Sequence, residues 1–261
     1  MELLGIDVST HQKKINWSQV AKTDISFAII RAGYGKNNVD KYFIENICGA
    51  STAGLDIGIY WFIYALNEQD AIENANKCHE TICLYKDEIK LKVWADWEYD
   101  SDEYSIKKGV VQNKSSRTRI VRTFLNRLRC LGYDVGVYAN PDYLETKFED
   151  LSEYPLWLAK YSGNRGGYCP FMWQYTSEGA IKGIDGDVDM NIGYFSIEEE
   201  PTYYPVPYFT LIESLMKIKV DSSYTHRQEI ARLNGIVDYK GTAEQNNRLL
   251  ELLKAGKLRK S

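Results

Sequence analysis

The sequence predicts an α/β fold, a closed or nearly closed β/α barrel, followed by a small helical domain. Residues 1–195 alternate short apolar runs with polar, helix-like stretches. The apolar runs are continuous, which is typical of parallel strands buried on both faces. A length of about 195 residues suits a β/α barrel, and an open doubly wound sheet is the alternative. No glycine-rich phosphate loop follows any run, so nucleotide binding has no support.

Seven apolar runs rich in β-branched and aromatic residues predict strands. They cover residues 3–8, 25–32, 57–64, 91–97, 135–138, 155–160 and 171–175. Residues 41–53, 68–86 and 115–131 between them predict helices. In the last of these, the apolar residues Ile120, Val121, Phe124, Leu125 and Leu128 recur at helical spacing, and Gly132 is a natural stop.

A proline-rich linker is predicted at residues 198–208, where Pro201, Pro205 and Pro207 favour a stiff, extended spacer. Beyond it, residues 209–220, 226–233 and 243–253 predict three short helices. The chain is therefore divided into a body (1–197), the linker and a helical module (209–261). A module of about 50 residues is near the lower limit for independent folding.

Charge is unevenly distributed along the chain, whose net charge is −4. Residues 209–261 hold ten basic and six acidic side chains, a balance of +4, which leaves −8 on the rest. An acidic body argues against a nucleic-acid reader. The basic tail suits contact with an anionic polymer. The apolar runs are shorter than the roughly 20 residues of a membrane span, so none is expected.

The five cysteines are scattered and odd in number, which favours buried free thiols in a reducing compartment over a disulfide framework. Three histidines make a multi-histidine metal site unexpected. The first residues show no basic stretch followed by an apolar core, so no secretory signal is expected.

Two carboxylates end the fourth apolar run, in the sequence Asp96-Trp97-Glu98. Side chains at i and i+2 of a strand point to the same side, so both carboxylates face what is the active end of a β/α barrel. Their repulsion should raise one pKa and leave a proton donor beside an ionised partner, the arrangement that glycoside cleavage uses. Two solvated carboxylates or a divalent-metal pair are the alternatives.

Two further aspartates could join this pair. Asp7 ends the first predicted strand, and Asp189 follows the last one. Because the first and last strands of a barrel are neighbours, these side chains could converge with Asp96 and Glu98. Asp7 could instead cap a turn. Asp189 could belong to a calcium-type loop, although no suitably placed glutamate completes one.

Eight short motifs occur in an order that resembles glycoside hydrolase family 25, the muramidase-type lysozymes of phage endolysins and bacterial autolysins. The resemblance spans about residues 3–195. The motifs are Gly5-Ile6-Asp7-Val8-Ser9, Ile29-Ile30-Arg31-Ala32-Gly33-Tyr34-Gly35, Gly58-Ile59-Tyr60-Trp61-Phe62, Asp96-Trp97-Glu98, Tyr138-Ala139-Asn140, Leu156-Trp157-Leu158-Ala159-Lys160-Tyr161, Trp173-Gln174-Tyr175 and Val188-Asp189-Met190-Asn191.

The resemblance implies a flattened β/α barrel that cuts the β-1,4 bond from N-acetylmuramic acid to N-acetylglucosamine in peptidoglycan. It makes Glu98 the general acid/base and Asp96 the group that orients or stabilises the transition state, with Asp7 and Asp189 completing an acidic cluster. Either the substrate's N-acetyl group or an aspartate attacks the anomeric carbon. No cofactor and no metal is implied.

Six further positions match the family's sugar groove: Tyr60, Tyr138, Trp157, Tyr161, Gln174 and Arg31. The aromatic ones could instead fill the core, and Arg31 could form a structural ion pair. Trp61 and Trp97 stand where many family members carry other residues, which predicts altered packing of the groove.

The tail resembles short helical wall-binding modules appended to such lysozymes. Its stretch Ile230-Ala231-Arg232-Leu233-Asn234-Gly235-Ile236 is similar to the helical part of LysM-type repeats. A dimerising or stabilising tail is the alternative. The expected free cysteines, together with the lack of an expected secretory signal, favour a phage endolysin held in the host cytoplasm until a holin releases it to the cell wall. An exported bacterial autolysin is the alternative. A catalytically inactive carbohydrate-binding barrel and a chitinase-like glycosidase are the competing functions.

Overall fold

The computed structural model describes residues 2–161, 163–195 and 210–259. The chain divides into two compact units, Met1–Ser196 and Ile197–Ser261. The proline-rich linker predicted at 198–208 lies outside the described residues. No helix in the described ranges combines the length and the apolar character that crossing a membrane requires.

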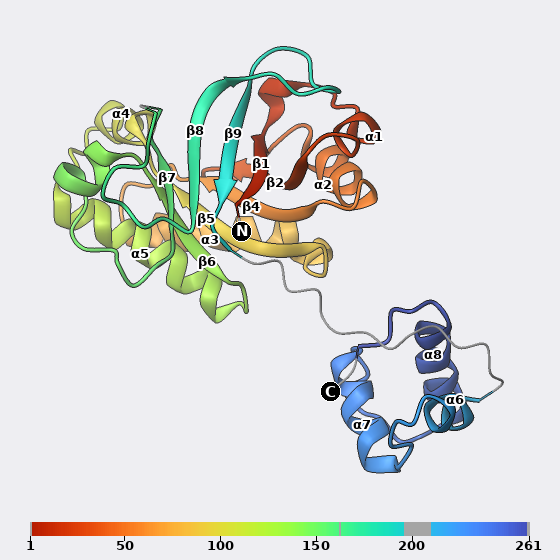
Figure 1. Cartoon of the computed structure of the whole chain (residues 1–261). Coiled ribbons are helices and arrows are strands. Elements are labelled where there is room, and N and C mark those ends of the chain that lie inside the picture. Colours follow the sequence, from red (N-terminus) through yellow and green to blue (C-terminus); the bar gives the residue numbers. More distant parts are fainter. Residues whose placement is uncertain (1, 162, 196–209, 260–261) are drawn as a thin grey trace. The chain divides into compact units, whose positions relative to one another are not determined.

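Eight strands of the first unit close into a barrel in the order β1-β9-β8-β7-β6-β5-β4-β2, and β2 pairs back to β1 (Figure 1). All neighbouring pairs are parallel except those of β9, which runs antiparallel to β1 and β8. This confirms the predicted α/β barrel. The strands are β1 (Leu3–Val8), β2 (Ile25–Tyr34), β4 (Asp56–Phe62), β5 (Ile89–Asp96), β6 (Val135–Ala139), β7 (Leu156–Ala159), β8 (Met172–Gly179) and β9 (Val188–Gly193), while β3 (Asn38–Val39) forms a hairpin with the end of β2.

Helices connect most of the parallel strands and cover the barrel from outside. The α3 and α5 helices pack against each other, and α5 also contacts β5 and β6. The helical elements of this unit are η1 (Thr10–Gln12), α1 (Trp17–Val20), α2 (Phe43–Thr52), α3 (Glu68–Ile82), η2 (Cys83–Tyr85), α4 (Tyr99–Lys107), α5 (Lys114–Cys130) and the single π-helical turn η3 (Tyr143–Lys147). The predicted helices at 41–53, 68–86 and 115–131 correspond to α2, α3 with η2, and α5.

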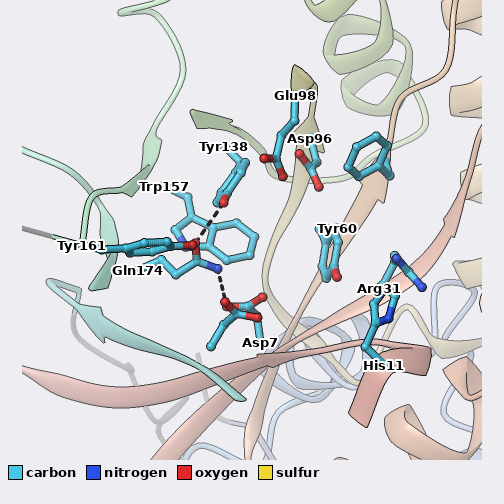
Figure 2. A pocket seen from close by; sticks show the side chains of 12 residues that line it. Asp7, His11, Arg31, Tyr60, Asp96, Glu98, Tyr138, Trp157, Tyr161 and Gln174 are labelled. Carbon is cyan, nitrogen blue, oxygen red and sulfur yellow. Dashed lines mark hydrogen bonds between the residues drawn. The ribbon is translucent and has the colours of Figure 1, made fainter. Parts of the chain in front are cut away.

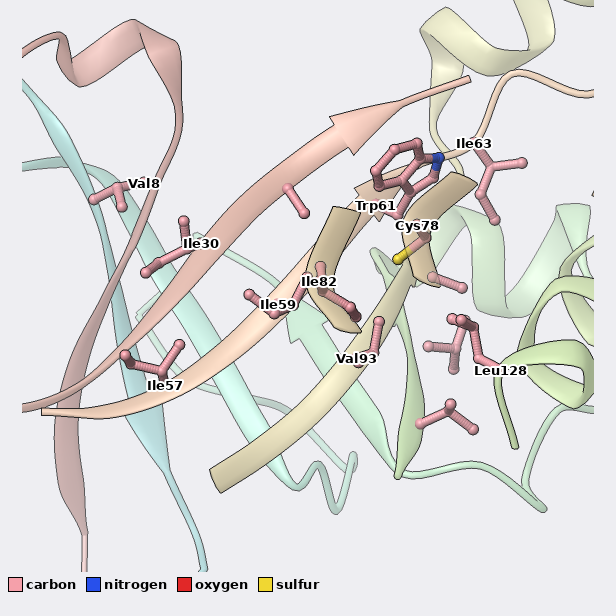
Figure 3. Packing of buried hydrophobic residues seen from close by; sticks show 14 of the residues in the cluster. Val8, Ile30, Ile57, Ile59, Trp61, Ile63, Cys78, Ile82, Val93 and Leu128 are labelled. Atoms are coloured by element: carbon pink, nitrogen blue, oxygen red, sulfur yellow. The ribbon is translucent and has the colours of Figure 1, made fainter. Parts of the chain in front are cut away.

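Alternation along the strands divides the buried side chains between two faces. In β2, Phe27 and Ile29 belong to a cluster inside the barrel, whereas Ala28 and Ile30 belong to the larger cluster beneath the helices. That larger core continues through α3, α5 and the outer faces of β4 and β5 (Figure 3). Large rings fill the interior at one end of the barrel. Inward-pointing side chains further along the strands therefore line the opposite end.

Glycines make room for these inner rings. A Cβ atom on Gly5 would lie 2.3 Å from the ring of Phe27, and one on Gly136 would lie 2.3 Å from the ring of Trp94. Both distances are far shorter than real carbon contacts, so a side chain at either glycine would displace the packed ring. The rings of Phe27 and Trp94, both fully buried, thus close one end of the barrel.

The second unit has a core of its own. Its helices α6 (Leu211–Lys217), α7 (Tyr224–Leu233) and α8 (Ala243–Lys254) correspond to the three predicted ones. Each begins at a capping hydroxyl, from Thr210, Ser223 and Thr242 respectively. The helices enclose an apolar cluster that contains Leu211, Leu215, Ile230, Leu249, Leu250, Leu253 and Leu258.

All five cysteines are free thiols. The expectation that they are buried is wrong for four of them, because only Cys78 is buried. Burial raises the pKa of the Cys78 thiol well above its ordinary value. The other four, Cys48, Cys83, Cys130 and Cys169, are exposed.

Candidate active site

A pocket of about 250 Å³ opens at the carboxyl ends of the parallel strands (Figure 2). All ten residues predicted from the sequence line it: Asp7, Arg31, Tyr60, Asp96, Glu98, Tyr138, Trp157, Tyr161, Gln174 and Asp189. His11 and Phe62 complete the lining. The structure therefore brings the predicted residues together, while their individual roles in catalysis stay predictions.

Asp96 and Glu98 point into the pocket side by side, from the end of β5 and the start of α4 (Figure 2). The backbone on both sides of the pair is fixed. The Ile63 amide donates to the Asp96 carbonyl oxygen at 2.8 Å, and the Glu98 amide donates to the Ser101 hydroxyl at 3.2 Å. These bonds fix the backbone from which both carboxylates project.

The pair is mostly withdrawn from water, and Asp96 is only 4% exposed. Burial raises the pKa of Asp96 well above its usual range, and the negative charge of Glu98 raises it further. Burial also raises the pKa of Glu98, although a hydrogen bond with Asp96 opposes this rise. Because two ionised carboxylates repel each other in a buried site, the pair resists losing its last proton. It can therefore act as a proton donor above the pH at which a free carboxyl group ionises.

Asp7 lies at the end of β1 and accepts two amide hydrogen bonds on Oδ2. The donors are Nε2 of Gln174 and Nδ2 of Asn191, each at 2.8 Å. Burial and the nearby charge of Asp189 raise the pKa of Asp7 well above its usual range, against the lowering effect of the two amides. Gln174 is oriented in turn, because its Oε1 accepts from the hydroxyls of Tyr138 and Tyr161 at 2.9 and 2.8 Å.

Asp189 reaches the same pocket because β9 is antiparallel. The register of β1 and β9 places it directly opposite Asp7. Burial raises the pKa of Asp189 to about 6. The expectation that Asp189 follows the last strand is wrong, since it lies within β9, a strand that the sequence interpretation did not include. The convergence of the four acids on one pocket is nevertheless as expected.

The aromatic wall of the pocket is tied to the barrel interior. The ring of Trp157 lies 4.7 Å from that of Tyr138 and 5.9 Å from that of Tyr60 between centroids. Trp157 is 2% exposed, and its Nε1 donates to Oδ1 of Asn191 at 2.8 Å. It therefore supports the wall and orients Asn191. Tyr161, which is 54% exposed, is the ring with the most surface open to a ligand among these.

Arg31 both lines the pocket and forms an ion pair. Its Nε lies 2.7 Å from Oδ2 of the buried Asp40. Asp40 also accepts from the backbone amides of Thr10 and Tyr42, at 3.0 and 2.9 Å. Arg31 is thus both a pocket residue and a member of a structural ion pair, because the ion pair holds its guanidinium at the edge of the pocket.

Sequence reasoning missed some of the residues around the pocket. Phe62 lies two positions after Tyr60 in β4, so strand alternation could have identified it. Asn191 lies two positions after Asp189 in β9, so the same alternation could have identified it. No pattern indicated His11 or Asp40. The expectation for Trp61 and Trp97 is wrong, because both are buried in the core outside the barrel interior and neither lines the pocket.

No group of three or more histidine, cysteine, aspartate or glutamate side chains within the described residues is arranged to hold a metal ion. The carboxylates of the pocket instead share their surroundings with aromatic rings and amides. A carboxylate pair with raised pKa values, facing aromatic side chains at the end of a β/α barrel, is the arrangement that glycoside hydrolases use.

Comparison with known proteins agrees with this class. The family model described as glycosyl hydrolases family 25 matches residues 6–184. The chain is 28% identical over 204 residues to the uncharacterized protein YegX of Escherichia coli K12, covering 75% of this chain and 71% of YegX. It is 26% identical over 192 residues to the autolytic lysozyme of Clostridium acetobutylicum, covering 72% of this chain and 54% of that protein.

The modular autolysin LytC of Streptococcus pneumoniae, solved in complex with a synthetic peptidoglycan ligand, has a similar structure. The TM-score is 0.64 at 28% identity, over 74% of this chain. The match spans about half of LytC, 47% of its chain. Since the family model covers most of the barrel unit, the chain belongs to glycoside hydrolase family 25.

Proposed function

We propose that this protein is a lysozyme that cleaves the β-1,4 bond between N-acetylmuramic acid and N-acetylglucosamine in peptidoglycan. The observation that carries the proposal is the buried Asp96–Glu98 pair, whose carboxyl groups have raised pKa values and face a pocket lined by aromatic rings. The peptidoglycan ligand of LytC and the lysozyme name of the Clostridium relative support this substrate class.

In this proposal the proton of the pair lies on Glu98 once the glycan is bound, and Glu98 donates it to the glycosidic oxygen as the bond to the anomeric carbon breaks. Asp96 stabilises the positive charge that develops on the sugar ring. No amide or hydroxyl in the described chain donates to Oδ1 of Asp96. This buried oxygen is therefore available to a donor on the substrate, such as an acetamide N–H. That position suits participation by the substrate's own N-acetyl group, with an aspartate nucleophile as the alternative.

Replacing Glu98 by glutamine tests the proposal. The two side chains are nearly isosteric, but the amide cannot donate an acidic proton. We expect the Glu98→Gln variant to lose at least about a hundredfold in the rate at which it clears a suspension of purified cell walls, the usual scale for general acid catalysis. Circular dichroism and the thermal midpoint should match those of the wild type, and Glu103→Gln, on the exposed side of α4, serves as the matched control.

The outcomes separate the competing functions. Wall binding without clearance by the wild type would indicate an inactive carbohydrate-binding barrel. Cleavage of chitin oligomers in preference to cell walls would indicate a chitinase-like enzyme. Clearance by a well-folded Glu98→Gln variant at near wild-type rate would remove Glu98 from the mechanism.

We further propose that the chain acts as a phage endolysin, made in the host cytoplasm and released to the wall by a holin. The five free thiols support synthesis in a reducing compartment. Fractionation of producing cells tests this: the protein should stay with the cytoplasmic fraction until a holin permeabilises the membrane. Appearance in the medium without a holin would favour an exported autolysin.

A further inference from the structure

A second hollow lies beside the catalytic pocket at the same end of the barrel. It has a volume of about 240 Å³ and is lined by Gly35, Lys36, Asn37, Asn38, Tyr64 and Tyr104. These residues come from the turn between β2 and β3, from the first residue of β3, from the segment just after β4, and from α4. None of them belongs to the lining of the catalytic pocket.

A row of aromatic rings connects the two cavities. Phe62 lines the catalytic pocket, and its ring centroid lies 5.1 Å from that of Tyr64. The ring of Tyr64 lies 5.0 Å from that of Tyr104. All three side chains are half-buried, so each keeps part of its surface open. The row therefore extends the aromatic wall of the catalytic pocket into the second hollow.

The frame of the second hollow is fixed to the barrel. The Gly35 amide donates to the Phe62 carbonyl oxygen at 2.9 Å. The Gly35 carbonyl oxygen accepts from Nε1 of the buried Trp61 at 3.1 Å. Gly35 has a φ of +60°, which a glycine adopts without strain. The turn that forms one wall of the hollow is thus anchored through both the amide and the carbonyl group of Gly35.

Charge around the hollow favours a neutral ligand. The Lys36 ammonium lies 2.6 Å from a carboxylate oxygen of Asp70 and 2.9 Å from one of Glu73, so two anions already compensate it. The ammonium of Lys108 lies 5.9 Å from the centre of the Tyr104 ring, at the limit of a cation–π contact. Asp100 is a further nearby anion and contributes to the raised pKa of Tyr64, after burial.

Hydrogen-bonding groups are available around the flat rings. Within the described chain, no protein group hydrogen-bonds the hydroxyls of Tyr64 or Tyr104, and the exposed amide of Asn37 lies at the rim. A pyranose ring presents an apolar face and a rim of hydroxyls, which matches this combination of aromatic surface and polar edge.

We propose that Tyr64 and Tyr104 form a second sugar-binding subsite, which holds a neutral pyranose ring of the glycan chain next to the catalytic pocket. This inference rests on the proposed function, because it takes the same glycan as the ligand. Tyr64 and Tyr104 contribute to the binding of long glycan chains and take no part in bond cleavage.

Hydrolysis of peptidoglycan glycan strands sorted by length tests the subsite. We expect Tyr104→Ala to lower kcat/KM on long strands at least about fivefold, which is the scale of one aromatic contact. The loss should come from a higher KM, with kcat unchanged. Activity on the shortest strands that the wild type cleaves should stay within twofold. Tyr104→Phe keeps the ring and should remain close to wild type on long strands. Ile106→Ala, an exposed position on the same helix outside the hollow, is the control.

If Tyr104→Ala fails to fold, Tyr104→Leu keeps the apolar volume and removes the flat face, with the same expectation. Equal losses on long and short strands, or no loss on either, would overturn the subsite while leaving the proposed function intact. If the wild type cleaves no strand, the proposed function fails. Calorimetric titration of the uncleaved long strands then decides the subsite: weaker binding by Tyr104→Ala supports it, and unchanged binding overturns it.

Discussion

Asp7 shows how a residue of the site affects folding. Its ordinary pKa is 3.8, and burial raises the pKa of this carboxyl well above that value in the folded protein. The folded state therefore binds the proton more tightly than the unfolded state. This contribution to stability is fully present below about pH 3.8 and is lost as the pH rises through the folded pKa. At neutral pH, an ionised Asp7 lowers the free energy of unfolding.

We therefore predict that Asp7→Asn is more stable than the wild type at pH 7, and that the difference shrinks as the pH approaches 4. The amide oxygen can still accept from Gln174 and Asn191, so the packing is kept. The same variant should clear cell walls more slowly, because the acidic cluster has lost one charge. Urea unfolding at both pH values measures the stability, with the exposed Asp24→Asn as control. A wild-type advantage at pH 7 would contradict this account.

At the scale of elements, a buried ion pair supports the segment that carries the catalytic carboxylates. Asp102 of α4 accepts from Nε of Arg117 at 2.9 Å and from the Tyr143 hydroxyl at 2.7 Å. It also accepts from Nε1 of Trp97, at 3.3 Å. Trp97 stands between Asp96 and Glu98, so this network connects α4, α5 and η3 to the backbone of the pair.

Arg117→Ala should destabilise the protein by roughly 3 kcal/mol, because it leaves the mostly buried Asp102 without its cation. The Arg119→Ala variant, two residues further along the same helix, breaks an exposed pair with Glu68 and should cost less than about 1 kcal/mol. Chemical denaturation of both variants makes the comparison. Equal costs would mean that the Asp102 network does not support the fold.

The sequence interpretation missed β9 and α4 for physical reasons. β9 carries Asp189 and Asn191, residue types that strands disfavour, because these side chains serve the pocket. Helix α4 has a weak apolar pattern, since only Ser101 and Ser105 are buried on it. Strands such as β1 were predicted with correct bounds because their apolar runs are continuous.

More of the pocket than of these two elements could be predicted from the sequence. The resemblance assigns the ten residues to motifs in or beside the barrel strands, and a barrel brings the carboxyl ends of its strands together. What remained hidden depends on contacts between distant segments. Asp40 lies in the segment after the β2–β3 hairpin and meets Arg31 only once that hairpin has formed.

At the scale of the whole molecule, the two units carry separate cores and opposite charge. We predict that a chain ending at Glu200 still hydrolyses soluble glycan strands at the wild-type rate but lyses intact cells more slowly. The reason is that a wall-binding module raises the effective concentration of the barrel at its polymer. The matching fusion of residues 209–261 to a fluorescent protein should label susceptible cells and be partly released by salt.

A fusion that stays in solution, together with full lysis by the shortened chain, would refute the targeting role. Self-association of the tail in sedimentation experiments would then identify it as an oligomerisation element.

Mass spectrometry of digested peptidoglycan tests the central claim most directly, because the newly formed reducing end shows which glycosidic bond was cut. The account predicts that the wild-type protein releases fragments ending in reducing N-acetylmuramic acid, and that Glu98→Gln releases essentially none under the same conditions. Fragments ending in reducing N-acetylglucosamine, or muramic acid ends released equally by Glu98→Gln, would contradict it.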